Sequence, residues 1–437
     1  MKIQPSAGVN LSRFKRPPDQ LEVLYGLPKS VRFCVACNMS NQQPMSSNEY
    51  THNKDSTKIT LSFDGEGVCH ACRFNQLKES GEINWDDRER ELQELCNQHR
   101  CDDGSYDCIV GGSGGKDSAM QSHLLKYKYG MHPLTVTWSP HLYTEIGWKN
   151  FQNWLHTGGF DNFLYTPNGR IHRLLTRNAT LNLLHPFQPF IMGQKTFVAK
   201  MAARLNIPLI FYGEMPGEYG EKISHKTSGY ASTSAGVESE GFKLDYLGGA
   251  DVRDVYLGGK QIGAYLDEGV ELADLTSYLP MDPAVLQRKG IDFKFMGYYK
   301  HWVPQEAYYY AVEHTGFEAN PARTEGTYSK YNSLDDKVDG FFYFTRWIKF
   351  GVGRAMMDSA QEIRNHHIDK HEAIALMRRY EGEYPARYEK EFLDYISMTR
   401  EEFLATCDKF RSPHLWEVID GEWALRYTPW GDPVTTA

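Results

Sequence analysis

The hydrophobic pattern of the central chain alternates between two periods. Short apolar runs indicate buried strands at residues 107–110, 134–138, 163–165 and 208–212. Longer segments, in which apolar residues recur at helical spacing, lie between these runs. The helices expected from them cover residues 116–129, 145–157, 170–184 and 194–205. Strands that alternate with helices form parallel βαβ units, so the pattern predicts an α/β fold with a doubly wound parallel sheet covered on both faces.

The two ends of the chain follow other patterns. Residues 1 to about 75 are rich in turn formers, and a charged amphipathic helix is expected over residues 85–100. A Gly- and Ser-rich stretch from about residue 213 to 263 predicts long loops around a site. From Leu334 onward the pattern is mainly helical, and Thr399 marks a helix start. We therefore expect an N-terminal region (1–100), a central sheet domain (101–280) and a mainly helical C-terminal region (281–437).

Composition and charge narrow the class of protein. Aromatic residues make up 13% and charged residues 24%, as in an ordinary globular protein. No stretch approaches the roughly 20 apolar residues that a membrane span needs. The start of the chain lacks the apolar core of a secretory signal, so we expect a cytoplasmic protein. The formal charge of −8 disfavours binding to nucleic acid without sequence preference, which requires a basic surface.

A glycine-rich turn, Gly-Gly-Ser-Gly-Gly-Lys-Asp-Ser at residues 111–118, joins the first expected strand to its helix. Backbone N–H groups and the positive end of the helix dipole converge in such a turn, which favours an anion. A carboxylate beside a phosphate is repulsive unless a cation lies between them, so we assign Asp117 to Mg²⁺ and Lys116 to additional positive charge. The residues expected to bind ATP are Gly112, Ser113, Gly114, Gly115, Lys116, Asp117 and Ser118, with Gln194 near the same sheet edge.

Spacing excludes two other glycine motifs. A Walker A loop needs glycine where Val110 stands and Ser or Thr where Asp117 stands, and a dinucleotide fingerprint starting at Gly112 also needs glycine at residue 117. The remaining match is the SGGxDS pattern of a PP-loop, the pyrophosphate-binding turn of the adenine nucleotide alpha hydrolase-like fold. A PP-loop holds the β and γ phosphates as the leaving group, so it predicts transfer of AMP onto an oxygen.

Two CxxC pairs, Cys34/Cys37 and Cys69/Cys72, have the ligand types and spacing of a tetrahedral zinc site. We expect a structural Zn²⁺ there, with four reduced cysteines or a redox pair as the alternative. The other cysteines lack such spacing and are expected to be ordinary residues, although three of them leave an iron–sulfur site to be excluded. These three are Cys96, Cys101 and Cys108.

Further motifs surround this framework. They are Pro189–Gln194 (PFIMGQ), Phe211–Glu214 (FYGE), Gly297–Tyr299 (GYY), Asp335–Gly340 (DDKVDG) and Lys349–Arg354 (KFGVGR). With the cysteine pairs and the SGGKDS loop, they resemble the N-acetyl sugar amidotransferases of the PseA and WbpG type, from about Cys34 to Tyr380. These enzymes belong to bacterial surface-glycan pathways, including lipopolysaccharide O-antigen and pseudaminic acid biosynthesis.

The resemblance implies that an acetamido group on a nucleotide-linked sugar becomes an acetamidino group, with ATP as the activating cofactor. It also implies that ammonia comes from a separate glutaminase subunit, and no cysteine of this chain stands in a recognisable glutaminase nucleophile turn. This activity agrees with the chemistry of the turn. An amide carbonyl is unreactive toward ammonia, so adenylation of its oxygen supplies the leaving group that an amidine synthesis requires.

Individual charged residues complete the candidate catalytic set, which also contains Lys116 and Asp117. Glu214 follows an expected strand at the edge where open α/β sheets bind ligands, although a capping role is equally compatible. Lys349 and Arg354 flank a glycine break and are candidates to contact pyrophosphate or sugar-nucleotide phosphate, with solvated helix charges as the alternative. Asp336 and Asp339 precede a long helix, where acidic residues also favour the dipole.

Two other functions remain open. A tRNA thiolase of the same superfamily would require a basic groove and a catalytic cysteine pair or iron–sulfur cluster near the PP-loop, and the acidic composition disfavours it. A non-catalytic module that binds nucleotide through the turn would have no turnover to lose when Asp117 is changed to asparagine. The identity of the sugar and of its nucleotide is left open.

Overall fold

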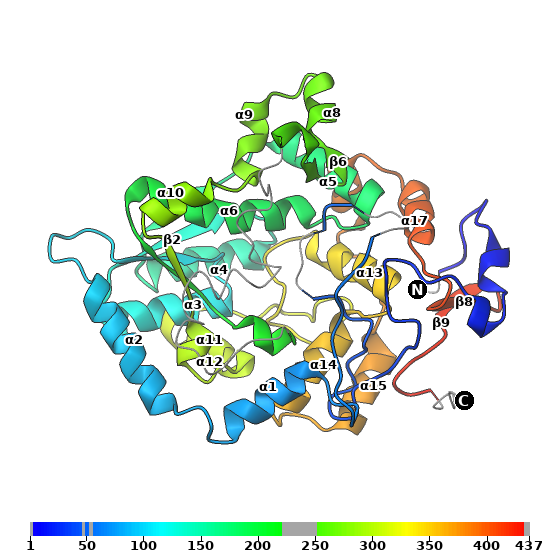
Figure 1. Ribbon diagram of the computed structural model, residues 1–437, viewed down its shortest axis with the longest axis horizontal. Helices are drawn as coiled ribbons and strands as arrows, with labels where there is room; N and C mark the ends of the chain where they lie inside the picture. Colours follow the sequence, from blue (N-terminus) through cyan, green and yellow to red (C-terminus); the bar gives the residue numbers. More distant parts are fainter. Residues whose placement is uncertain (1–2, 46–48, 52–55, 221–250, 432–437) are drawn as a thin grey trace.

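A five-stranded parallel sheet forms the centre of the molecule (Figure 1). The computed structural model describes residues 3–45, 49–51, 56–220 and 251–431. The strand order is β3-β2-β1-β4-β7, and every neighbouring pair is parallel. The strands are β1 (Cys108–Gly111), β2 (Pro133–Trp138), β3 (Asn162–Tyr165), β4 (Leu209–Tyr212) and β7 (Asp292–Phe295). The expected α/β class with a parallel sheet is confirmed.

Both faces of the sheet are buried under helices. Successive strand residues point to opposite faces. Ile109 and Ile210 pack in one hydrophobic cluster with residues of α6, whereas Val110 and Phe211 pack in another with Leu125 and residues of α11 and α12. In Figure 1, α5 and α6 lie above the sheet and α3, α11 and α12 lie below it. The helices concerned are α3 (Lys116–His123), α4 (Glu145–His156), α5 (Gly169–Leu183), α6 (Gln188–Leu205), α11 (Met296–Tyr299) and α12 (Pro304–Thr315).

The order of the strands creates a crevice between β1 and β4. The chain passes from β1 outward to β2 and β3, and then returns to the other side of β1 with β4. The loops that follow β1 and β4 therefore diverge, which is the topological switch point where open α/β sheets bind ligands. The glycine turn follows β1 and Glu214 follows β4. The fold thus brings these two sequence motifs to the same edge of the sheet.

The fifth strand, β7, comes from residues 292–295, beyond the position where we expected the sheet domain to end. It pairs with β4 through Leu209–Tyr212. The segment between β4 and β7 contains 221–250, which lie outside the described residues. Its described part forms η4 (Pro216–Tyr219), η7 (Val252–Asp254), β5 (Tyr256–Leu257), β6 (Lys260–Gln261), α8 (Ile262–Asp267), α9 (Leu272–Leu275), η8 (Thr276–Tyr278) and α10 (Pro283–Arg288). The domain limits themselves stay a prediction.

The N-terminal and C-terminal regions pack against each other. Trp423 N–H donates to the Ile3 carbonyl at 2.9 Å, and the cysteine-rich segment shares a hydrophobic cluster with Met356 and Met377. The N-terminal helices are η1 (Leu11–Phe14), η2 (Pro18–Gln20), α1 (His70–Glu79) and α2 (Trp85–His99). The C-terminal elements are α13 (Asp339–Phe350), α14 (Arg354–Arg364), α15 (Lys370–Tyr380), α16 (Glu389–Ile396), α17 (Arg400–Lys409) and the hairpin of β8 (Trp416–Ile419) and β9 (Glu422–Leu425).

Helix starts follow the sequence in one case and depart from it in another. Thr399 caps α17 and forms a capping box with Glu402, which confirms the expected start. The helix expected from residue 194 begins at Gln188 instead, so Gln194 lies inside α6 and cannot cap it. Proline is tolerated in a first helical turn, and Pro189 lies there. Gly193 lies inside α6, where a Cβ would come within 2.2 Å of the Trp138 ring, so close packing explains the glycine.

Candidate active site

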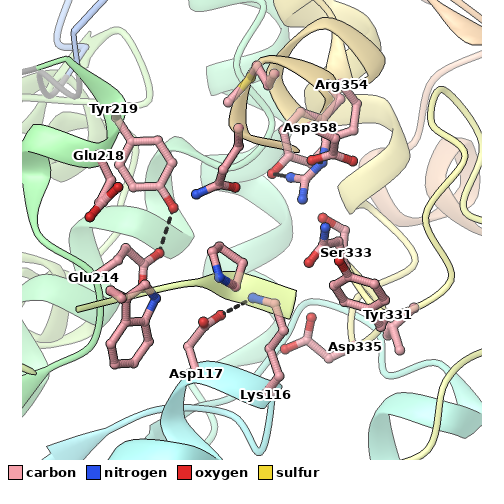
Figure 2. A pocket seen from close by; sticks show the side chains of 18 of the residues that line it. Lys116, Asp117, Glu214, Glu218, Tyr219, Tyr331, Ser333, Asp335, Arg354 and Asp358 are labelled. Atoms are coloured by element: carbon pink, nitrogen blue, oxygen red, sulfur yellow. Dashed lines mark hydrogen bonds and ion pairs between the residues drawn. The ribbon is translucent and has the colours of Figure 1, made fainter. Parts of the chain in front are cut away.

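A cavity of about 380 Å³ opens at the switch point of the sheet. Among the segments that line it are the glycine turn, the loop after β4, residues 331–335 and the helices α13 and α14. Figure 2 shows Lys116 and Asp117 at its base, with Glu214 and Tyr219 on one side and Arg354 on the other. Residues more than two hundred positions apart in the sequence therefore face one another across a single space.

The glycine turn has the geometry of an anion site. Gly114 has a φ of +84°, and a Cβ at this position would come within 2.8 Å of the Phe151 backbone. Gly115 precedes α3 as its N-cap residue and makes no side-chain capping hydrogen bond. Glycine has no side chain that could cap the first N–H groups of α3, and the positive end of this helix lies at the cavity. Ser118 supports the turn, because its hydroxyl donates to the Gly115 carbonyl at 3.0 Å.

Two carboxylates lie on the glycine-turn side of the cavity, and Lys116 pairs with one of them. Lys116 Nζ lies 2.5 Å from Asp117 Oδ2, whereas Asp117 Oδ1 is buried without a hydrogen-bond partner among the described residues. Burial raises the pKa of Glu214, and the negative charge of Asp117 raises it further. Tyr219 donates a hydrogen bond to Glu214 Oε1 at 2.7 Å. An orphaned carboxylate oxygen beside a second carboxylate fits a bound cation such as Mg²⁺.

The opposite wall carries a positive charge. Arg354 pairs with Asp358 at 2.8 Å and also binds the Tyr343 hydroxyl. The N–H groups at the start of α14 are already occupied, because Gly353 donates to Glu381 Oε1 at 2.5 Å and Met356 donates to Oε2 at 2.9 Å. The group that this wall offers to a ligand is therefore the guanidinium of Arg354, because the backbone N–H groups of the glycine break already bind Glu381.

Asp335 connects the two sides of the cavity. Burial raises the pKa of its carboxyl group, while a hydrogen bond with Ser113 of the glycine turn acts in the opposite direction. The neighbouring Asp336 faces elsewhere, where it accepts hydrogen bonds from the backbone N–H and from Nδ1 of His141, both at 2.7 Å. Burial also raises the pKa of Asp339 to about 7. Of these three acidic residues, Asp335 is the one that lines the cavity.

The structure gathers most of the expected site residues but not all. Those lining the cavity are Ser113, Gly114, Gly115, Lys116, Asp117, Glu214 and Arg354. Gly112 lies in the turn behind them, where a Cβ would come within 2.2 Å of Ser118. Lys349 and Gln194 line a second cavity instead. Lys349 is buried there, with Nζ 2.7 Å from Glu49 Oε2 and 2.9 Å from the Leu183 carbonyl.

Several lining residues escaped the sequence analysis. They are Glu218, Tyr219, Tyr331, Asp335, Tyr343, Arg346, Asp358 and Arg364. Asp335 stands in the motif of residues 335–340, of which only Asp336 and Asp339 were discussed individually as candidates. Tyr343 and Arg346 are three positions apart on α13, and Arg354 and Asp358 are four apart on α14, so each pair shares a helix face. This spacing is the one sequence pattern that could have indicated these residues, but it is equally typical of ordinary helix surfaces.

The four cysteines of the two CxxC pairs form one cluster. Their sulfur atoms all lie within 4.8 Å of one another, and all four residues are buried. Such a set of thiolates could hold a zinc ion. Arg364 reaches this cluster from the active-site side, with Nη1 3.9 Å from Cys37 Sγ. Among the described residues, no other group of histidine, cysteine and acidic side chains comes together in this way, and Cys96 and Cys108 belong to the hydrophobic core.

The fold, the cavity and the cysteines together define a class of protein. It is an α/β protein with a ligand cavity at the carboxyl ends of a parallel sheet and a buried cysteine cluster. Residues 325–428 match the family described as "LPS biosynthesis protein WbpG-like, C-terminal domain". This part of the chain is similar to a WbpG-like C-terminal domain, which confirms the resemblance to the WbpG type. The match supports a role in glycan biosynthesis. The matched domain supplies Arg354 and Asp335 to the cavity.

A second comparison concerns a shorter segment. The uncharacterized protein MJ1599 of Methanocaldococcus jannaschii is 34% identical over 80 residues, which are 18% of this chain. The chain spans 28% of the length of that relative. Within the part of the chain that the structure describes, no helix has the length and apolar character needed to cross a membrane.

Proposed function

We propose that the protein is an AMP-forming, ATP-dependent amidotransferase that converts the acetamido group of a nucleotide-linked N-acetylated sugar to an acetamidino group. The observation that carries this proposal is the orphaned oxygen of Asp117 beside Glu214, at the base of a cavity that an anion-binding turn opens. The match to the WbpG-like domain supports a sugar substrate, because that family is described as taking part in the biosynthesis of lipopolysaccharide, which contains sugars.

In this proposal residues 112–118 act as a PP-loop for the pyrophosphate of ATP. The N–H groups at the start of α3 bind phosphate oxygens, and Lys116 contributes a positive charge. Asp117 and Glu214 would hold Mg²⁺, which supplies neutralising charge at the pyrophosphate. Arg354 faces this site from the opposite wall and stabilises negative charge that develops on the adenylyl group.

The reaction balances in two steps. The amide oxygen of the substrate attacks the α-phosphorus of ATP, the bond from that phosphorus to the bridging oxygen breaks, and pyrophosphate leaves. Ammonia then attacks the amide carbon, gives up a proton, and the carbon–oxygen bond breaks to release AMP with the former amide oxygen. Asp335 is suited to accept the proton, because burial raises the pKa of its carboxyl group and a carboxylate with a raised pKa is a stronger base. The nitrogen of ammonia remains as the new amidine nitrogen.

The sugar is assigned to the wall formed by residues 331–335 and α14. Tyr331 offers an aromatic face, while Asn332, Ser333 and Asp358 offer acceptors and donors for hydroxyl groups. Ammonia is supplied by a separate glutaminase subunit. The cysteine cluster holds structural zinc. The pathway is O-antigen or nonulosonic acid biosynthesis, with pseudaminic acid as one example of the latter.

A tRNA thiolase is less compatible with the cavity. Such an enzyme needs a catalytic cysteine near the adenylated base. No cysteine is present among the described residues that line the cavity.

The direct test incubates the purified chain with ATP, Mg²⁺, ammonium and a panel of N-acetylated sugar nucleotides. Mass spectrometry should find a product in which NH replaces O, formed together with AMP. A glutaminase activity of the chain alone would contradict the separate ammonia source. Formation of ADP in place of AMP would contradict the proposed reaction.

A further inference from the structure

A second cavity, of about 280 Å³, adjoins the proposed ATP cavity. Its walls come from α6, α13 and the segments around Met45 and Leu184. Arg346 lines both cavities, so its side chain lies at the junction between them. A ligand that occupied both spaces would therefore contact this guanidinium group.

Arg346 is a half-buried cation whose guanidinium group has buried donors without acceptors in the described part of the chain. Its Nε and one terminal nitrogen are buried and have no hydrogen-bond partner among the described residues. Burial lowers the pKa of Arg346 to about 10, and the charge of Arg354 acts in the same direction. Buried donors of this kind are costly unless they are satisfied, and a guanidinium group binds phosphate oxygens with paired hydrogen bonds. An anionic ligand at the junction would supply the missing acceptors.

The other charged groups of the second cavity also favour an anion. Lys195 and Lys349 line it together with Arg346, whereas Glu49 is the acidic residue on its described wall. Glu49 pairs with Lys349 at 2.7 Å and with Lys58 at 3.5 Å, so its charge is already neutralised. The described wall of this cavity therefore holds more basic than acidic side chains.

Apolar side chains line the remainder of this cavity. Phe342, Ile191 and Phe350 are among them, and the Phe342 ring stacks on that of His185 with centroids 5.1 Å apart. Flat aromatic surfaces of this type are suited to a nucleobase. A cavity lined by both basic and aromatic side chains suits the two parts of a nucleoside diphosphate.

We propose that the second cavity binds the nucleoside diphosphate of the sugar substrate, with Arg346 on the diphosphate at the junction. This inference rests on the proposed function, because it requires the acetamido group to reach ATP in the first cavity. ATP lies on the glycine turn with its own phosphates, so the two diphosphates occupy separate sites. Arg346 is then a substrate-binding residue that distinguishes a nucleotide-linked sugar from the free sugar.

A binding measurement tests this site without any turnover. The full chain is saturated with a non-hydrolysable ATP analogue and titrated calorimetrically with UDP, GDP, CDP and a sugar 1-phosphate. We expect one of the nucleotides to bind, and Arg346→Gln to weaken it by about tenfold to a hundredfold, the range for loss of a charge-assisted hydrogen-bonding group. Arg346→Lys keeps the charge but cannot form the paired hydrogen bonds, so its affinity for the nucleotide should lie between those of the wild type and Arg346→Gln. Arg378→Gln, at an exposed position of α15, is the matched control and should bind like the wild type.

Each result has a clear consequence. Failure of the wild type to bind any of these nucleotides, or equal binding by Arg346→Gln, overturns the inference. Binding of the sugar 1-phosphate as tightly as the nucleotides shows that the cavity does not recognise the nucleoside, and also overturns it. In turnover assays the variant should raise KM for the nucleotide sugar alone. A rise confined to KM for ATP would place Arg346 in the ATP site, and one confined to ammonium would make the cavity a passage for ammonia. A wild type that binds UDP yet forms no AMP would contradict the proposed function and leave this site intact.

Discussion

Replacement of Asp117 by asparagine removes one negative charge from the base of the cavity at nearly constant volume. The lost ion pair with Lys116 involves a carboxylate side chain that is 29% exposed, so it should cost at most about 1 kcal/mol of unfolding free energy. Relief of repulsion with Glu214 offsets part of that cost. AMP formation should fall by about a hundredfold to a thousandfold, comparable with the loss of one preorganised electrostatic group.

The pKa of Glu214 provides a second measure of the same variant. Burial and the charge of Asp117 raise this pKa, so the contribution of Glu214 to stability is complete below its unfolded value and is lost as the pH rises through the folded value. In Asp117→Asn the folded pKa moves closer to the unfolded one. The protein without nucleotide should therefore lose less stability as the pH is raised.

Both quantities can be measured on the same preparation. AMP release is followed with saturating Mg²⁺ and ATP, and urea unfolding is recorded at several pH values. Asp102→Asn, at an exposed position before β1, is the control. A variant with undiminished AMP formation, or one destabilised by several kcal/mol, would refute the view that Asp117 serves the ligand and not the fold.

Three further predictions concern other parts of the molecule. Lys78 and Glu218 form a buried pair at 2.8 Å, so Lys78→Met should lower the unfolding free energy by about 3–5 kcal/mol in urea, and Glu218→Gln in the same chain should restore part of it. Burial raises the pKa of Glu381 from 4.5 to about 7, so stability should decline as the pH rises across that interval, and Glu381→Gln should flatten the decline in unfolding titrations. Cys34→Ser should reduce bound zinc, measured by elemental analysis, and lower the thermal midpoint, whereas Cys101→Ser at an exposed position should change neither; equal metal content in both would contradict a cysteine site.

The parallel sheet could be predicted because its first four strands are apolar and lie close together in the sequence. β7 was missed because its four residues include Asp292 and Lys294, which suggest an exposed segment. In the structure these two charges pair with each other, and Lys294 is buried. A charge pattern alone does not reveal such pairing. The order of the strands also depends on contacts between segments that are distant in the chain.

The glycine side of the cavity could be predicted because its chemistry is local. Residues 113–117 follow one another, and their spacing excludes other glycine loops. The opposite wall is assembled by packing of α14 against the cysteine-rich segment and of α13 against α14, which no local pattern encodes. Lys349 illustrates the difficulty, because it stands three positions from Arg346 yet faces only the second cavity. A displacement of about one turn along the same helix face decides which cavity a side chain lines.

In the proposed reaction the acetamido oxygen of the substrate is adenylated on the glycine turn. An isotope experiment follows this oxygen, with a sugar substrate whose acetamido oxygen is ¹⁸O in the presence of ATP and ammonium. The label should appear in a phosphate oxygen of AMP, in an amount equal to the amidine formed. Unlabelled AMP, or label found only in phosphate or water, would contradict this reaction.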